Sequence, residues 1–179
     1  MLVEVKVQSL ALDRSTNTPV VILQELEGER VLPIWIGPGE ASAIAMHLAD
    51  MEFSRPLTHD LLCSVLRGLG GVLQKVIISK VEVSTYYAEL IVRRNGEIFS
   101  LDARPSDSIA VALRVQAQIF AQNDLLEEAT IEIADDEEAA GLSFDVPRAP
   151  EQEEGMGPEE LKEHLRRLDP EDFGRFDLP

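Results

Sequence analysis

DARPSDSIAVALR occupies residues 102–114, and this stretch predicts the end of a strand, a turn and the start of a helix. Pro105 fixes its own φ and forces Arg104 out of helical conformation. Ser106 can cap the next backbone amides, and Asp107 places negative charge in the first turn, where the helix dipole favours it. The position at which this helix begins is therefore well determined by the sequence.

The same stretch joins a core segment to a charged rim. Residues 109–113 are apolar on almost every side and rich in alanine, so we expect this part of the helix to pack closely against a sheet. Asp102, Arg104 and Asp107 crowd the junction before it. Polar side chains held at the rim of a packed scaffold often form functional sites. The junction is therefore the first candidate for a site.

Alternating apolar residues and turn signals predict the other elements of the chain. Strands are expected over residues 2–10, 20–26 and 30–36, and a helix over 40–50. A second helix should follow with Thr58 as its N-cap. Strands over 73–83, 86–94 and 97–103 then precede the helix of the opening stretch, and a short strand near 118–121 and a helical turn near 124–128 follow it.

A shift of 67 residues lays the helix that starts at Glu40 over the helix that starts at Asp107, which indicates an internal duplication. Asn95-Gly96 predicts a tight type I′ hairpin inside the second copy, and Pro33 suggests an edge strand or a bulge in the first. We therefore predict an α+β fold. Its duplicated β-β-β-α units would form one curved or barrel-like, mainly antiparallel sheet with the helices packed outside.

The composition divides the chain into three parts. Residues 1–131 are expected to form the globular domain, 132–157 an acidic flexible linker, and 158–179 a short C-terminal helix and tail. Acids outnumber bases by 33 to 16, and the net charge is −17. Such a charge gives no general attraction to a phosphate backbone, so any nucleic-acid role must depend on a local patch.

Three further features limit the class of protein. No run of about 18 apolar residues is present, and the N-terminal residues do not resemble a signal peptide, so we expect a cytoplasmic protein with no membrane partner. Cys63 is the only cysteine and has no neighbours at zinc-ligand spacing, so we interpret it as a small buried apolar group.

Three ordered blocks of sequence resemble the bifunctional nuclease domain family. They are LPIWIG at residues 32–37 with EASAIA at 40–45, RPLTHDLL at 55–62, and DARPSDSIA at 102–110. The resemblance covers roughly residues 1–130 and leaves most of the acidic tail outside. It implies a compact α+β domain with a duplicated plan that assembles as an oligomer and has nuclease activity on RNA and DNA.

A nuclease must activate water and neutralise the charge that develops on phosphate. Candidates for both tasks lie at the helix starts and junctions of this chain. We predict four catalytic residues, Glu40, His59, Asp102 and Asp107, and two substrate-binding residues, Arg55 and Arg104. The cofactor would be Mg²⁺ or Mn²⁺, with metal ligands that the sequence leaves unknown.

Each candidate also has a plain structural interpretation. An acid at a helix start is favoured by the helix dipole whatever the function, which applies to Glu40 and Asp107. His59 could be an ordinary hydrogen-bonded histidine, and Asp102 and Arg104 could form a structural ion pair. Trp35 is interpreted as a core or interface residue and only weakly as a platform for base stacking.

The sequence therefore supports two functional hypotheses. The first is a metal-assisted nuclease that hydrolyses phosphodiester bonds in RNA and DNA. The second is a non-catalytic regulatory module that binds a ligand or a protein, because no His-x-Glu pair, glycine loop or nucleophile elbow is present. In either case apolar surface near the sheet edge favours a homo-oligomer, with a dimer preferred.

Overall fold

The computed structural model describes residues 1–13 and 15–129. Its elements run in the order β1 (Leu2–Asp13), β2 (Thr18–Glu25), β3 (Val31–Trp35), α1 (Pro38–Leu48), α2 (Thr58–Gly68), β4 (Gly71–Glu82), β5 (Thr85–Arg94), β6 (Glu97–Ala103), α3 (Pro105–Val115) and β7 (Gln118–Gln122). A further helical segment covers residues 123–129. The predicted linker at 132–157 and the predicted helix at 158–179 lie outside the described residues.

The strands form one seven-stranded sheet in the order β3-β2-β1-β7-β4-β5-β6. Every neighbouring pair is antiparallel except β4 and β7, which run parallel. Among the described strands, β7 is the last in sequence and lies at the centre, where it joins the β1-β2-β3 meander to the β4-β5-β6 meander. β3 is an edge strand, as Pro33 predicts.

The α+β class is confirmed, but the sheet is mixed and not closed, because β3 and β6 are free edges. The barrel-like form of the prediction is thus not confirmed. The order β-β-β-α does occur twice, with α2 between the two copies. A common origin of the two copies stays a prediction.

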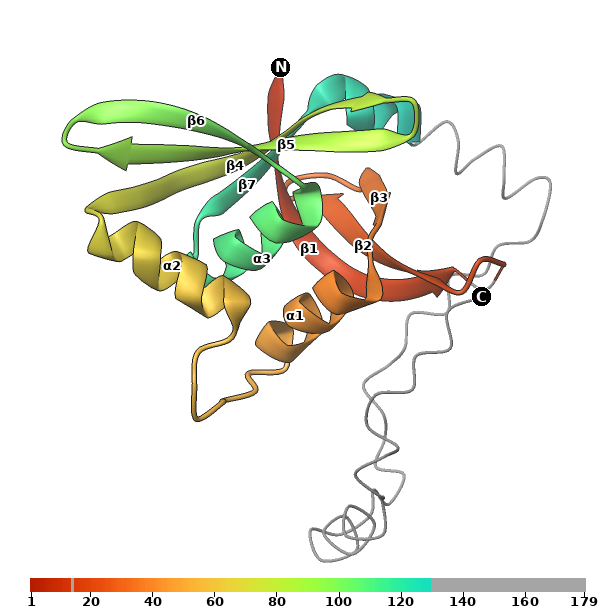
Figure 1. Ribbon diagram of the computed structural model, residues 1–179. Helices are drawn as coiled ribbons and strands as arrows, with labels where there is room; N and C mark the ends of the chain where they lie inside the picture. The colour runs from red at the N-terminus through yellow and green to blue at the C-terminus, as the bar shows by residue number, and fades with distance from the viewer. Residues whose placement is uncertain (14, 130–179) are drawn as a thin grey trace, which may run out of the picture. The chain divides into compact units, whose positions relative to one another are not determined.

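The three helices α1, α2 and α3 lie together on one side of the strands (Figure 1). α3 is central: it contacts α1 and α2 and packs on β4, β5 and β7. Its residues from Ile109 to Ala112 are buried, as predicted, and Ile109 is fully enclosed. Cys63 on α2 is also buried, which confirms its interpretation as a core residue. Because α3 is wedged in this way, its N-terminus has a fixed position between the other two helices.

Two predicted details are wrong, and both concern caps. Thr58 is the first residue of α2 and not its N-cap, because the Asp60 carboxylate accepts a hydrogen bond from the backbone N–H of Leu57 and fixes the cap there. Ser106 does not cap α3 through its side chain. Arg104 is the N-cap, with the extended φ and ψ of −69° and 145° that a residue before proline adopts.

Candidate functional site

All three labelled helices carry an acid three residues after the N-cap. In α2 this acid is Asp60, and its carboxylate caps the helix. In α1 and α3 the acids are Glu40 and Asp107, and neither helix has a side-chain cap hydrogen bond. Both carboxylates bind Arg104 instead. The helix dipole favours all three acids, but it does not explain why two of them turn toward the same guanidinium.

Four of the six predicted site residues form one connected network, which we call the Glu40–His59 network. Arg104 Nη2 lies 2.8 Å from Glu40 Oε1, and Arg104 Nε lies 2.8 Å from Asp107 Oδ2. The other oxygen of Asp107, Oδ1, is 3.1 Å from His59 Nε2. The network thus links the N-terminal turns of α1, α2 and α3. Its members are Glu40, Arg104, Asp107 and His59.

The charges of the network stabilise one another. Burial by itself raises the pKa of the Asp107 carboxyl, but the hydrogen bonds from Arg104 and His59 outweigh burial and hold this pKa below its usual value. The same contact with Asp107, followed by the charge of Glu40, raises the pKa of Arg104. Asp107 is therefore ionised at neutral pH and accepts hydrogen bonds on both oxygens.

Exposure differs along the network. The Arg104 side chain is 66% exposed, whereas that of His59 is only 12% exposed. Only Nε2 of the His59 ring has a hydrogen-bond partner among the described residues. A neutral His59 that donates from Nε2 to Asp107 keeps the lone pair on Nδ1. This arrangement can orient a proton acceptor next to an exposed cation.

The other two predicted residues are not part of the network. Asp102 is exposed on β6, where it lies opposite Glu89 of β5. The predicted ion pair between Asp102 and Arg104 is not formed, because Arg104 bonds Glu40 and Asp107. Arg55 is exposed between α1 and α2, and no ion pair joins it to the network in the described part of the chain.

Sequence reasoning missed the role of Arg114, which is not among the predicted site residues. Its side chain is only 7% exposed, and its Nε lies 2.6 Å from Asp60 Oδ1. Nη1 donates to the Ala110 carbonyl and Nη2 to the Ala43 carbonyl. Arg114 therefore ties α1, α2 and α3 together beneath the network. No sequence signal distinguishes it from an exposed arginine near a helix end.

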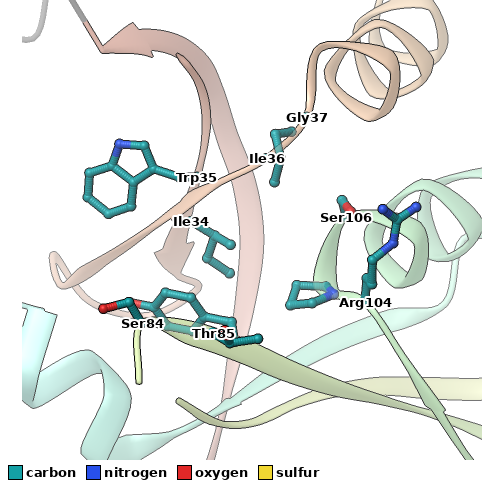
Figure 2. A pocket seen from close by; sticks show the side chains of 10 residues that line it. Ile34, Trp35, Ile36, Gly37, Ser84, Thr85, Arg104 and Ser106 are labelled. Carbon is teal, nitrogen blue, oxygen red and sulfur yellow. The ribbon is translucent and has the colours of Figure 1, made fainter. Parts of the chain in front are cut away.

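A pocket of about 270 Å³ opens beside Arg104, between the end of β3, the β4–β5 turn and the start of α3. Figure 2 shows Trp35 on one side and Arg104 on the other. Trp35 is 51% exposed, so it is not a core residue, and its alternative interpretation as an interface residue stays a prediction. Its indole Nε1 donates to Asp13 Oδ2 over 3.1 Å.

The carboxylates that the structure brings together are the groups that could hold the predicted metal. Among residues 1–13 and 15–129, no group of three or more His, Cys, Asp or Glu side chains is placed to hold a metal ion. In the network, Arg104 contacts both carboxylates, so a cation bound between them would have to displace its guanidinium. The network as it stands does not fit a metal, and we derive no step through one.

The model of the bifunctional nuclease domain matches residues 21–134, which is more than half of the chain. The chain belongs to the bifunctional nuclease domain family. The matched region includes all four residues of the Glu40–His59 network and both walls of the pocket. In the part of the chain that the structure describes, no helix is long and apolar enough to cross a membrane.

Relatives fall into two groups. An uncharacterised protein of Mycobacterium tuberculosis is 41% identical over 172 residues, which cover 95% of this chain and 97% of the relative. Bifunctional nuclease 1 of Oryza sativa subsp. japonica is 24% identical over 110 residues, covering 60% of this chain and 33% of that protein. Bifunctional nuclease 2 of the same rice is 26% identical over 122 residues, covering 66% of this chain and 38% of that protein. The family resemblance of the sequence blocks is thereby confirmed.

Proposed function

We propose that this protein hydrolyses phosphodiester bonds in RNA and DNA at the Glu40–His59 network. The observation that carries the proposal is the shared carboxylate of Asp107, which accepts from His59 on one oxygen and from Arg104 on the other. Family membership and the nuclease names of the rice relatives support the reaction class. A base and a phosphate-binding cation held by one acid are the parts that such a reaction uses.

The proposed chemistry assigns one task to each residue. His59 takes a proton from water at Nδ1 while the water oxygen attacks phosphorus, and Asp107 stabilises the imidazolium that forms. That proton is then available to the leaving sugar oxygen as the phosphorus–oxygen bond breaks. Arg104 donates to the phosphoryl oxygens as negative charge develops there. Glu40 is a positioning residue, because it reaches the reaction only through Arg104.

The predicted metal stays a separate proposal. A bound Mg²⁺ or Mn²⁺ would neutralise charge on the phosphate and polarise it. Asp102 and Arg55 likewise stay predictions as site residues, and their separation from the network makes them useful comparisons. Asp102 provides a matched acid for a substitution at Asp107, since both can be replaced by asparagine with little change of volume.

The test is hydrolysis of labelled single-stranded RNA and DNA by highly purified protein with Mg²⁺, with Mn²⁺ and with chelator. His59→Gln and Asp107→Asn should each lower the rate by about 10²- to 10⁴-fold, the usual contribution of general acid–base catalysis. If the network alone carries the reaction, Asp102→Asn should retain the activity of the wild type, whereas a loss of activity would support the predicted catalytic role of Asp102. Circular dichroism and thermal unfolding must show that each variant is folded.

Two outcomes contradict the proposal. If Asp107→Asn and Asp102→Asn cut as fast as the wild type, the observed cleavage comes from a contaminant or from another site. If no preparation cuts under any condition, the network is structural. The low exposure of His59 and the mutual neutralisation of the charges would then favour the second hypothesis, a non-catalytic binding module.

We also propose that the protein forms a homodimer. α2 and its C-cap residue expose four large apolar side chains, and edge strand β6 exposes three more. They are Leu61, Leu62 and Val65 on α2, Leu69 at its C-cap, and Ile98, Phe99 and Leu101 on β6. An open edge strand with apolar side chains is a surface that proteins normally cover.

A further inference from the structure

We infer that the pocket between Trp35 and Arg104 binds one unstacked nucleobase of a single-stranded RNA or DNA, with the base against the indole and an adjoining phosphate at Arg104. The inference rests on the proposed function and specifies its substrate as single-stranded.

Trp35 is presented to solvent by a strand whose other large side chains are buried. Leu32 and Ile34 of β3 lie in the core, while Trp35 at the end of the same strand is half exposed. The polar atom of the indole is already satisfied by Asp13, whose carboxylate also accepts from the backbone and hydroxyl of Ser15. The ring is therefore tethered at its edge, which leaves an aromatic surface oriented in advance for stacking.

The pocket is small. Its volume of about 270 Å³ is just below the range of about 300–1,000 Å³ that is typical of drug-sized ligand sites. Ser84 and Thr85 form part of its wall from the β4–β5 turn (Figure 2). Val83 and Ser84 have left-handed φ values of 47° and 62°, so a tight two-residue turn carries these hydroxyls to the rim. The hydroxyls can donate to or accept from the edge of a base.

Arg104 supplies the opposite wall and remains able to bind an anion. Its guanidinium has five N–H donors, and two contacts hold it to Glu40 and Asp107. Those two carboxylates offset its charge, and the whole chain carries a net charge of −17. Attraction for phosphate is therefore weak. Stacking must therefore supply most of the affinity, and the affinity should depend only slightly on salt. A plot of the logarithm of the binding constant against the logarithm of the salt concentration should have a slope near −0.7, the value for one phosphate contact on a single strand.

This geometry discriminates against a duplex. Bases in a double helix are stacked on both faces and cannot lie against an aromatic ring, whereas single strands can present an unstacked base. A sugar–phosphate chain without a base would lack the stacking partner altogether. The pocket therefore predicts binding of single strands, much weaker binding of duplexes, and little binding of abasic strands.

The first measurement uses the fluorescence of Trp35, which is the single tryptophan of the chain. Full-length protein in chelator is titrated with a short oligothymidylate, an abasic strand of equal length, and a duplex of equal length. We expect the single strand to quench the emission and the other two to leave it nearly unchanged. Equal quenching by the abasic strand or the duplex overturns the inference.

The second measurement is the anisotropy of a labelled single strand with three variants. Trp35→Ala should weaken binding roughly 5- to 150-fold, which corresponds to the loss of one stacked base. Trp35→Phe keeps a ring and should retain most of the affinity. Phe53→Ala removes an exposed aromatic side chain outside the pocket and should bind as the wild type does. Unchanged binding by Trp35→Ala overturns the inference.

Failure of this inference can be told apart from failure of the proposed hydrolysis by adding His59→Gln. If His59→Gln stops cleavage while Trp35→Ala binds normally, the reaction stands and the base pocket is wrong. If Trp35→Ala loses binding but no preparation cleaves, the base pocket stands and the reaction is wrong. If Trp35→Ala loses binding and His59→Gln binds but does not cut, both are supported.

Discussion

Replacing Arg114 by methionine should destabilise the fold more than any other substitution of a single arginine in the described chain. Arg114 is enclosed at the junction of three helices, and its guanidinium contacts Asp60, Ala43 and Ala110. Methionine fills much of the same space without a charge. Arg114→Met therefore removes the contacts while the apolar packing of the stem is largely retained.

The size of the effect can be worked out from those contacts. A hydrogen bond to a charged group contributes about 1.5–3 kcal/mol, and most of the effect comes from the contact with Asp60, because the Ala43 and Ala110 carbonyls lie inside helices and keep their backbone hydrogen bonds. Asp60 is 37% exposed, so water recovers part of the loss on its carboxylate. We expect the free energy of unfolding to fall by about 2–4 kcal/mol, and the urea midpoint by about 1–2 M for a domain of this size.

The pH dependence provides a second signature. The hydrogen bond from the Leu57 N–H, and then that from Arg114, lower the pKa of Asp60. The pKa of Asp60 is thus lower in the folded protein than the value of about 3.9 in the unfolded chain. Ionised Asp60 therefore stabilises the fold at pH values above about 3.9, and this stabilisation is lost as the pH falls through the folded-state pKa. The difference in stability between wild type and Arg114→Met should therefore be largest near neutral pH and should shrink as Asp60 becomes protonated.

The control is Arg67→Met, which removes the same charge from an exposed position on α2. It should change the free energy of unfolding by less than about 0.5 kcal/mol. The structural reasoning is refuted if the two variants have the same urea midpoint at neutral pH, or if the deficit of Arg114→Met is as large in acid as at pH 7.

Two further predictions concern the network and the dimer. A Cβ at Gly37 would collide with the Glu40 carboxylate, so Gly37→Ala should push Glu40 away from Arg104 and slow hydrolysis about 10- to 100-fold with little loss of stability. The control is Gly39→Ala, where a Cβ meets no atom within 4 Å, and this variant should cleave at the wild-type rate. Equal rates for the two variants would show that Glu40 does not position Arg104. Leu62→Lys places a charge on the exposed face of α2, so this variant should sediment as a monomer at low micromolar concentration. Leu12→Lys, on the exposed surface of β1, should still sediment as a dimer. A wild-type protein that sediments as a monomer contradicts the proposed dimer.

Proline and glycine allowed the local structure to be predicted. Pro105 occupies the first position of α3, and Asn95 and Gly96 have the left-handed φ values that a type I′ turn requires. These residues restrict the backbone directly, so no tertiary information is needed. The start of α1 was predicted two residues late, at Glu40, whereas the helix begins at Pro38. The cap of α2 was misplaced by one residue because a carboxylate can cap a helix from within its first turn, as Asp60 does.

Long-range relationships were predicted less well. His59 and Asp107 were both candidates, but only packing of α2 against α3 brings their side chains together. An arginine near a helix end can point outward or inward with the same sequence pattern, and Arg114 points inward because Asp60 and two carbonyls meet it there. Trp35 follows an apolar run that suggests burial, yet the pocket at the sheet edge leaves it exposed.

The central position of β7 has a consequence for the order in which the protein can fold. β1 leaves the ribosome before the other described strands, yet one of its partners in the sheet is β7, at residues 118–122, and β4 pairs with the same strand. Until that strand is made, each meander has an unpaired inner edge, and such edges are prone to aggregate. The ribosome must therefore translate β7 before the β1-β2-β3 and β4-β5-β6 meanders can fold as one cooperative unit. A nascent chain stalled before residue 118 should accordingly be protease-sensitive and dependent on chaperones, whereas one released after residue 129 should not.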